Sequence, residues 1–390
     1  MGGRLTLVVL GMMGRMPFAG QTWLYLNWLR GLSKLGHQVF YVEDDTVWPY
    51  HPGHNAVTDD CSYAVSHISG CMARIGLPDR WAFRLADRKG ACWGMSPARL
   101  RDLYSSCDAL LNIVGATDLR EDHLRAPLRV YVETDPVISE LKLAHGDEHT
   151  RKALANHHVV ATYGENYGAP DCGVPLGDRE YLKTRQPVDL ELWPMTYTPQ
   201  ARFFTTVGNY RQSGDDVEYE GRLYLWSKHH EWQRFMDLPQ RTSQAFRLAM
   251  LPDDRADREL LTSHGWQLTS PFEMSLDVFG AYADFIRQSR AELTVAKDQN
   301  ISLRSGWFSE RDACYLASGK PVVAQDTGFP NILPTGDGLF AFGTIEEAVA
   351  AIEAVNADYR HHCEAARALA EESFEAAAVA GRLLDDVGLA

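Results

Sequence analysis

The pattern that most constrains this chain lies in its first 45 residues, where strand-like and helix-like segments alternate. Residues 5–10 form a run of leucine and β-branched side chains, typical of a strand buried on both faces of a parallel sheet. After a glycine-bearing loop, residues 21–35 carry a broad apolar stripe, and Gly36 follows where a left-handed residue ends a helix. A second strand at 38–42 completes a βαβ unit and predicts a parallel α/β sheet.

The same alternation recurs along the rest of the chain. Residues 48–100 are richer in aromatic and loop residues, and we expect helices and an insertion over the sheet there. Further strands are predicted at residues 109–114, 128–132, 157–162, 203–207, 245–251, 266–268, 292–296 and 321–324. Helical patterns lie at residues 228–237, 255–264, 275–289, 309–318 and 346–384.

Four prolines between residues 175 and 199 mark a region of weak periodicity, where we place a domain boundary. The prediction is an α/β protein with two Rossmann-like, doubly wound domains, residues 1–197 and 198–370, facing each other across a cleft. Residues 371–390 form a C-terminal helix that could pack back on the first domain. In such folds the default ligand site is the cleft at the carboxyl ends of the strands.

The net charge and the cysteine content of the chain exclude several classes of partner and of structural site. A formal net charge of −14 argues against a nucleic-acid backbone or an anionic membrane surface as the main partner, because either needs a basic footprint. The seven cysteines include no CxxC pair, so reduced thiols are favoured over disulfides or a zinc site. The N-terminal apolar run is too short for a signal peptide or a membrane helix, and a cytoplasmic protein is expected.

The strongest local signal for a ligand site lies between residues 297 and 312. Ser309 with Asp312 three residues later resembles a capping box at a helix start, and a helix start attracts anions. Lys297 and Arg304 could add charge for a diphosphate. The alternative is that Ser309 is only a helix cap and the basic side chains are solvated.

Several motifs resemble glycosyltransferases of the GT-B fold, which use nucleotide-activated sugars. In the second half these are Ala-Ser-Gly-Lys-Pro-Val-Val at 317–323, Gln-Asp-Thr-Gly-Phe-Pro-Asn at 325–331 and Gly-Leu-Phe at 338–340. In the first half, Gly-Leu-x-x-Leu-Gly-His-x-Val at 31–39 follows a strand and a glycine loop, as in many such enzymes. The motifs occur in the family's order.

The resemblance implies a donor site for a nucleoside-diphosphate sugar, which acts as a co-substrate without a separate cofactor or metal. Backbone amides and basic side chains then stabilise the leaving diphosphate. The diphosphate and nucleotide would contact Gly208, Asn209, Lys297, Arg304, Ser305, Gly306 and Ser309. The sugar hydroxyls would contact Asp326, Thr327 and Gly328.

One departure from the family pattern leaves the stereochemical outcome open. Many retaining members carry a Glu-x7-Glu pair before the Gly-x-Pro motif, and the corresponding positions here are Gly306 and Cys314. The histidine base of many inverting members is also missing, because residues 12–21 contain no histidine.

Candidates for the acceptor side come from the first domain. Asp135 follows a predicted strand and precedes a proline, so it could be the catalytic base or simply a helix cap. Glu165, in the loop after the next strand, is a weaker catalytic candidate. Gly20, Gln21, Asp44 and Asp45 are candidates for binding the acceptor, a small molecule or a glycan.

His51 and His54 lie in an aromatic loop and either help to line an acceptor pocket or are ordinary surface residues. Two other functions remain open at this stage: an epimerase of nucleotide sugars on the same fold, and a binding protein without catalytic activity.

Overall fold

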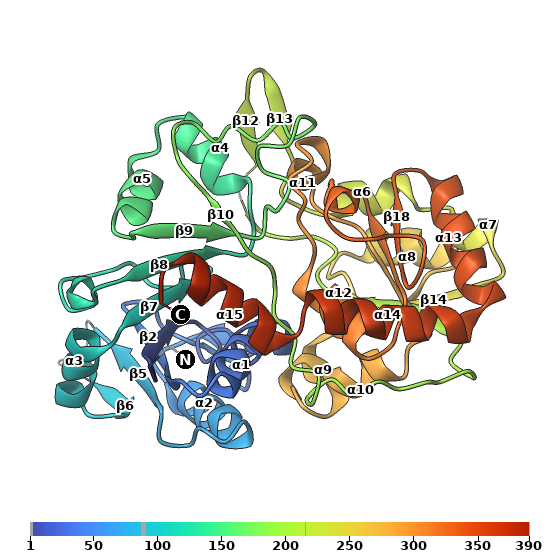
Figure 1. The fold of residues 1–390 in the computed structure, drawn as a ribbon. Coiled ribbons are helices and arrows are strands. Elements are labelled where there is room, and N and C mark those ends of the chain that lie inside the picture. The colour runs from blue at the N-terminus through green and yellow to red at the C-terminus, as the bar shows by residue number, and fades with distance from the viewer. Residues whose placement is uncertain (1–2, 87–90, 215, 390) are drawn as a thin grey trace.

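A computed structural model describes residues 3–86, 91–214 and 216–389 as two parallel sheets that lie side by side (Figure 1). The first sheet has the order β10-β9-β8-β7-β1-β2-β5-β6, and every neighbouring pair is parallel except β5 with β6. Its strands are β1 (Thr6–Leu10), β2 (Gln38–Asp45), β5 (Trp81–Leu85), β6 (Cys92–Gly94), β7 (Ala109–Ile113), β8 (Arg129–Glu133), β9 (Val159–Thr162) and β10 (Leu182–Lys183).

The second sheet is parallel throughout, with the order β15-β14-β11-β16-β17-β18. Its strands are β11 (Phe203–Val207), β14 (Ala245–Ala249), β15 (Gln267–Thr269), β16 (Ala291–Thr294), β17 (Val322–Gln325) and β18 (Leu339–Phe342). Two hairpins stand apart from the sheets: β3 (Tyr50–His51) with β4 (Ala56–Val57), and β12 (Val217–Tyr219) with β13 (Arg222–Tyr224). We call residues 3–183 the N-terminal half and residues 203–373 the C-terminal half.

Helices connect the strands in both halves. In the first they are α1 (Ala19–Lys34), α2 (Ser62–Arg74), α3 (Pro97–Ser106), α4 (Ile138–Ala144) and α5 (Glu148–Ala155), with a 3-10 turn at His123–Arg125. In the second they are α6 (His229–Arg234), α7 (Leu238–Arg241), α8 (Arg255–Ser263), α9 (Phe272–Leu276), α10 (Ala281–Arg287), α11 (Asp298–Ser302), α12 (Glu310–Ala317), α13 (Ile345–Ala357) and α14 (Tyr359–Ser373), with a 3-10 turn at Phe329–Asn331. α15 (Ala376–Asp386) is the last helix among the described residues.

Most predicted elements are confirmed, including the βαβ unit at the N-terminus. Gly36 takes a left-handed conformation after α1, with φ of +89°, as its position predicted. The capping box is also confirmed: Ser309 Oγ accepts a hydrogen bond from the backbone N–H of Arg311 at 3.2 Å, and Asp312 accepts one from the N–H of Ser309 at 3.3 Å.

Three predicted elements differ from the structure. The helical pattern at 346–384 is divided among α13, α14 and α15. The segment at 48–100 contributes more than an insertion, because β5 pairs in parallel with β2 and extends the sheet, and β6 adds an antiparallel edge. The helix predicted at 275–289 is two helices, α9 and α10. The carboxylate of Asp277 accepts hydrogen bonds from the N–H groups of Gly280 at 3.1 Å and Ala281 at 2.8 Å, so it interrupts one helix and begins the next.

The C-terminal helix crosses back to the N-terminal half (Figure 1), where α15 packs on α1. A Cβ at Gly31 of α1 would overlap the backbone of Ala376, so glycine permits this close helix contact. Just before α15, the N–H of Val188 donates to Phe374 O at 2.7 Å, and the N–H of Ala376 donates to Val188 O at 3.0 Å. The chain therefore passes between the halves at two adjoining places.

The halves also meet through α1. Trp23 is buried, its ring centroid lies 4.6 Å from that of Trp193, and its indole N–H donates to Val278 O at 3.1 Å. This contact places the start of α1 against α9 and the loop that follows it in the C-terminal half. In the described part of the chain, no helix combines the length and apolar composition needed to cross a bilayer.

Candidate functional site

A pocket of about 560 Å³ lies between the carboxyl ends of the two sheets. The N-terminal half contributes the loop before α1, the start of α1 and the residues that follow β7, β8 and β9. The C-terminal half contributes the residues after β11, part of α9 and the first turn of α12. Of the residues predicted for the site, Gly20, Gln21, Asp135, Gly208, Asn209 and Ser309 line this pocket.

Positively charged side chains lie along the wall of the pocket that the C-terminal half forms, which we call the C-terminal wall. Arg311, in the first turn of α12, lines it directly, and its guanidinium is held from behind by Glu292 at 2.5 Å and by Val207 O at 2.8 Å. Lys228 Nζ lies 5.1 Å from the ring centroid of Trp307, another lining residue. Burial, aided by the charge of nearby Arg311, lowers the pKa of Lys228 to about 7. Neither Lys228 nor Arg311 was predicted as a site residue from the sequence.

Lys297 links the C-terminal wall to the opposite wall of the pocket, which the N-terminal half forms and which we call the N-terminal wall. Its ammonium group stacks on the ring of Trp226, 3.2 Å from the centroid, and forms an ion pair with Asp135 across the cleft. Lys297 is only 6% exposed. Asp135 Oδ1 is buried and has no hydrogen-bond partner among the described residues. A buried carboxylate oxygen without a partner is costly, so it marks a place where a ligand can donate a hydrogen bond or a proton.

Glu310 is a second carboxylate of the pocket, and no sequence motif marked it as a site residue. It is the first residue of α12, and Asn27 Nδ2 of α1 donates to its Oε1 at 3.3 Å. Burial raises the pKa of Glu310 well above its usual value, which favours the neutral carboxylic acid.

Arg304 lies elsewhere, and its expected contact with a diphosphate needs correction. Its guanidinium donates to Asp171 at 2.7 Å and to Asp326 at 3.1 Å, so both of its partners are carboxylates of the protein. Asn166 and Asn331 complete the group by donating to Asp171 at 3.1 and 3.0 Å. We call this group of five side chains the polar joint, because it fastens the loop after β9 to the C-terminal half.

Five other residues predicted for the donor lie in or behind the polar joint and do not line the pocket: Ser305, Gly306, Asp326, Thr327 and Gly328. Their polar groups are engaged locally. Ser305 Oγ donates to Asn300 at 2.7 Å, Thr327 Oγ1 donates to Trp307 O at 2.5 Å, and the N–H of Gly328 donates to Asp326 at 2.7 Å. Gly306, with φ of +81°, leaves room for the backbone of Asn166.

Glu165, the second catalytic candidate, is also placed outside the pocket. Its carboxylate forms an ion pair with Arg185 at 2.6 Å, and the side chain is 14% exposed. Burial raises its pKa despite that arginine. Its position beyond the pocket lining argues against a role as the base.

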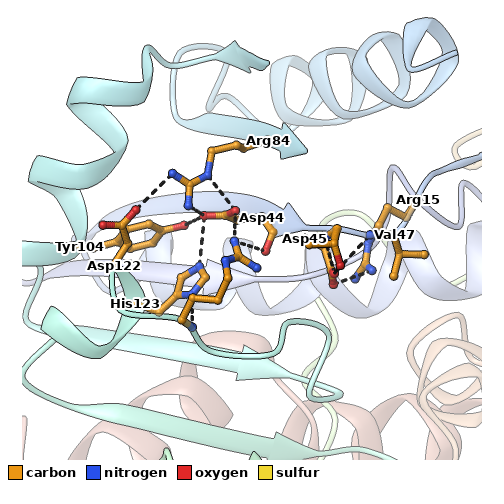
Figure 2. Close-up of polar contacts among 10 residues, drawn as sticks. Arg15, Asp44, Asp45, Val47, Arg84, Tyr104, Asp122 and His123 are labelled. Carbon is orange, nitrogen blue, oxygen red and sulfur yellow. Dashed lines mark hydrogen bonds and ion pairs between the residues drawn. The ribbon is translucent and has the colours of Figure 1, made fainter. Parts of the chain in front are cut away.

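Asp44 is corrected as an acceptor-binding candidate, because its side chain is fully buried in a charged cluster (Figure 2). It accepts hydrogen bonds from Arg84 at 2.8 Å, Tyr104 at 2.9 Å and His123 at 3.1 Å, and from Arg120. Burial alone would raise the pKa of Asp44, but the hydrogen bonds from His123 and Arg84 hold it well below its usual value. This carboxylate fixes the end of β2.

The side chains of Asp45 and Glu43 contact the loop after β1 and do not line the pocket. Asp45 forms an ion pair with Arg15 at 2.8 Å (Figure 2). Glu43 accepts hydrogen bonds from the N–H groups of Gly14 at 2.5 Å and Arg15 at 3.0 Å. Asp45 is therefore also corrected as an acceptor-binding candidate.

The chain resembles solved glycosyltransferase structures over almost its whole length. An α-glucosyltransferase in complex with UDP and a 13-mer DNA is 10% identical, with 99% of both chains covered and a TM-score of 0.58. HepE of Anabaena in complex with UDP-glucose is 11% identical, with 98% of this chain and 99% of HepE covered and a TM-score of 0.58. AviGT4, a glycosyltransferase involved in avilamycin A biosynthesis, is 14% identical, with 98% and 96% covered and a TM-score of 0.53.

This likeness confirms the predicted fold class: the chain has the two-sheet GT-B architecture of these glycosyltransferases. No protein-family model matches the sequence, and no curated protein matches it.

Proposed function

We propose that this chain is a glycosyltransferase that moves a sugar from a nucleoside-diphosphate donor to a small-molecule or glycan acceptor. The observation that carries the proposal is the cleft pocket, where a cationic wall from one half faces an unsatisfied carboxylate from the other. The GT-B architecture supports it, since solved proteins of this architecture include complexes with UDP and UDP-glucose.

The C-terminal wall would bind the donor. Lys228 and Lys297 supply positive charge, and the first turn of α12 adds the partial positive charge of a helix start. These groups would stabilise the leaving diphosphate as the bond to the sugar breaks, the task that a metal ion performs in other enzymes. We therefore propose that donor binding needs no divalent cation, and that calorimetry gives the same affinity with EDTA as with Mg²⁺.

The N-terminal wall would bind the acceptor and remove its proton. Asp135 is our candidate base because its Oδ1 lies buried in the pocket without a partner, while Lys297 holds the other oxygen. Such a base contributes typically 10²- to 10⁴-fold to the rate. Gly20 and Gln21 would contribute to the acceptor surface near Asp135.

The test begins with calorimetry against a panel of nucleoside diphosphates, uridine first because the solved neighbours carry it. Binding of one nucleotide selects the donor, and absence of binding to all of them contradicts the proposal. The matching nucleotide sugar is then incubated alone. An epimerised product would point to the epimerase that the sequence left open, whereas a glycosyltransferase needs an acceptor for turnover.

A further inference from the structure

The β3–β4 hairpin carries a cluster of metal-binding side chains outside the pocket. His51 Nε2 and His54 Nε2 both lie 3.6 Å from the same atom, Asp60 Oδ2. The three candidate ligand atoms lie within 4.8 Å of one another. His51 and His54 were expected to line an acceptor pocket or to be surface residues, and they are not among the residues that line the cleft pocket.

These distances match the edges of a tetrahedral metal site. Zinc binds histidine nitrogen and carboxylate oxygen at about 2.0–2.2 Å, so neighbouring ligands of a tetrahedral ion lie about 3.3–3.5 Å apart. For the two histidine–carboxylate pairs, which lie 3.6 Å apart, an ion therefore requires shifts of only tenths of an ångström. Two imidazoles and one carboxylate are a typical three-ligand set for Zn²⁺, and they leave the fourth position for water or another ligand.

Backbone hydrogen bonds already position Asp60 and the hairpin turn that carries the two histidines. Asp60 Oδ1 accepts a hydrogen bond from the N–H of Ser62 at 2.9 Å, which leaves Oδ2 facing the histidines. The N–H of His54 donates to His51 O at 3.1 Å and so closes the hairpin turn. The ring of Tyr63 packs edge-on against His51, with centroids 5.6 Å apart. A hydrogen bond that orients a ligand in this way raises metal affinity by about 10- to 100-fold.

We propose that His51, His54 and Asp60 form a zinc site that ties the β3–β4 hairpin to the start of α2. The ion would lie between two imidazole nitrogens and a carboxylate oxygen that lies 3.6 Å from each of them without it. A second cluster, Asp337 with His361 and His362, is less suited. There His361 already bonds Asp337 at 2.8 Å, and the Nδ1 atom of His362 accepts from the N–H of Gly338 at 3.3 Å.

The site has a structural route to the cleft. Tyr50 directly precedes His51, and its ring centroid lies 5.4 Å from that of Phe18, which lines the pocket on the N-terminal side. The N–H of Tyr50 also donates to Arg15 O at 2.9 Å, in the loop after β1. Bound zinc would thus stabilise the N-terminal wall of the pocket. That this wall binds the acceptor is a consequence that rests on the proposed function.

The test is isothermal titration of ZnCl₂ into the full chain after treatment with EDTA and removal of the chelator. We expect one high-affinity ion per chain. His54→Ala removes an exposed ligand without disturbing the core, and it should weaken zinc binding by more than about 100-fold, because even loss of a group that only orients a ligand costs about 10- to 100-fold. The matched control is His361→Ala, an exposed histidine of the second cluster, which should keep full affinity.

Replacement of zinc by Co²⁺ gives a second, spectroscopic measurement. A tetrahedral Co²⁺ site absorbs strongly in the visible range, and Asp60→Asn should remove that absorption. Failure of the wild-type chain to bind zinc, unchanged binding in His54→Ala, or loss of binding in His361→Ala would each overturn the proposal. None of these measurements uses a nucleotide, so failure of the zinc site and failure of the glycosyltransferase proposal are told apart.

Discussion

Two cations of the C-terminal half reach across to carboxylates of the N-terminal half, and they do so in opposite ways. Lys297 is buried and pairs with Asp135, whose second oxygen has no partner. Arg304 is 34% exposed in its side chain and is held by both Asp171 and Asp326. A buried ion pair in which one carboxylate oxygen lacks a hydrogen-bond partner is suited to binding a ligand. A surface ion pair in which both groups have their partners is suited to holding the two halves together.

The largest effect should come from replacing Asp135, whose Oδ1 lacks a hydrogen-bond partner. Asp135→Asn keeps the shape of the side chain but removes its basicity, so kcat should fall about 10²- to 10⁴-fold. Nucleotide affinity, measured by calorimetry, should stay within a few fold. Glu310→Gln is the matched control in the same pocket and should retain most activity, since burial already favours the neutral form of Glu310. Full activity of Asp135→Asn would exclude it as the base.

Lys297→Ala should weaken binding of the nucleoside diphosphate by about 1.5–3 kcal/mol, the value of a charge-assisted hydrogen bond. The loss would appear in the dissociation constant from calorimetry. Lys34→Ala is a suitable control, because Lys34 lies on α1 and pairs with Asp189 and Glu191 away from the pocket. Equal affinity of the two variants would remove Lys297 from the donor site.

Lys228 should make donor binding depend on pH. Its pKa is lowered to about 7 in the free protein, so the ammonium form prevails below pH 7 and is lost above it. A diphosphate favours the ammonium form, and affinity should therefore decline above pH 7, by at most about tenfold per pH unit. A nucleotide sugar is the better ligand here, because it lacks the terminal phosphate that titrates near pH 6. Lys228→Arg keeps its charge and should flatten the profile; a wild-type profile already flat from pH 6 to 9 would contradict this role.

The smallest effect should come from the polar joint. Arg304→Ala removes a partly exposed cation whose pairs are screened by solvent, so the Tm should fall by no more than about 2 °C. Nucleotide affinity should not change. A loss of affinity as large as that of Lys297→Ala would instead restore Arg304 to the donor site and erase the contrast between the two cations.

Sequence patterns predicted the parts of the site that depend on local structure. Gly208 and Asn209 follow a buried strand, and Ser309 begins a helix, so their positions at the edge of the cleft follow from strand and cap signals. Asp135 was likewise placed by the strand before it. In a parallel sheet the carboxyl ends of the strands share one edge, and the fold then brings such residues together.

Roles that depend on distant partners could not be predicted in this way. Arg304 lies close in sequence to the helix start at Ser309, but its left-handed backbone, with φ of +49°, accompanies a side chain that bonds Asp171, 133 residues away. Asp44 ends a strand as a ligand-binding carboxylate would, yet it bonds His123, 79 residues further on. Only the three-dimensional structure shows that partners within the protein already neutralise the charges of Arg304 and Asp44.

The contact between α15 and Gly31 also bears on how the chain folds during synthesis. The face of α1 around Gly31 is completed by α15, which follows the first sheet by almost 200 residues. At synthesis rates of about 5–20 residues per second, roughly 10–40 s separate the completion of the first sheet from the arrival of α15. During that time the N-terminal half exposes an apolar helix face on the ribosome, and deletion of α15 would make that exposure permanent.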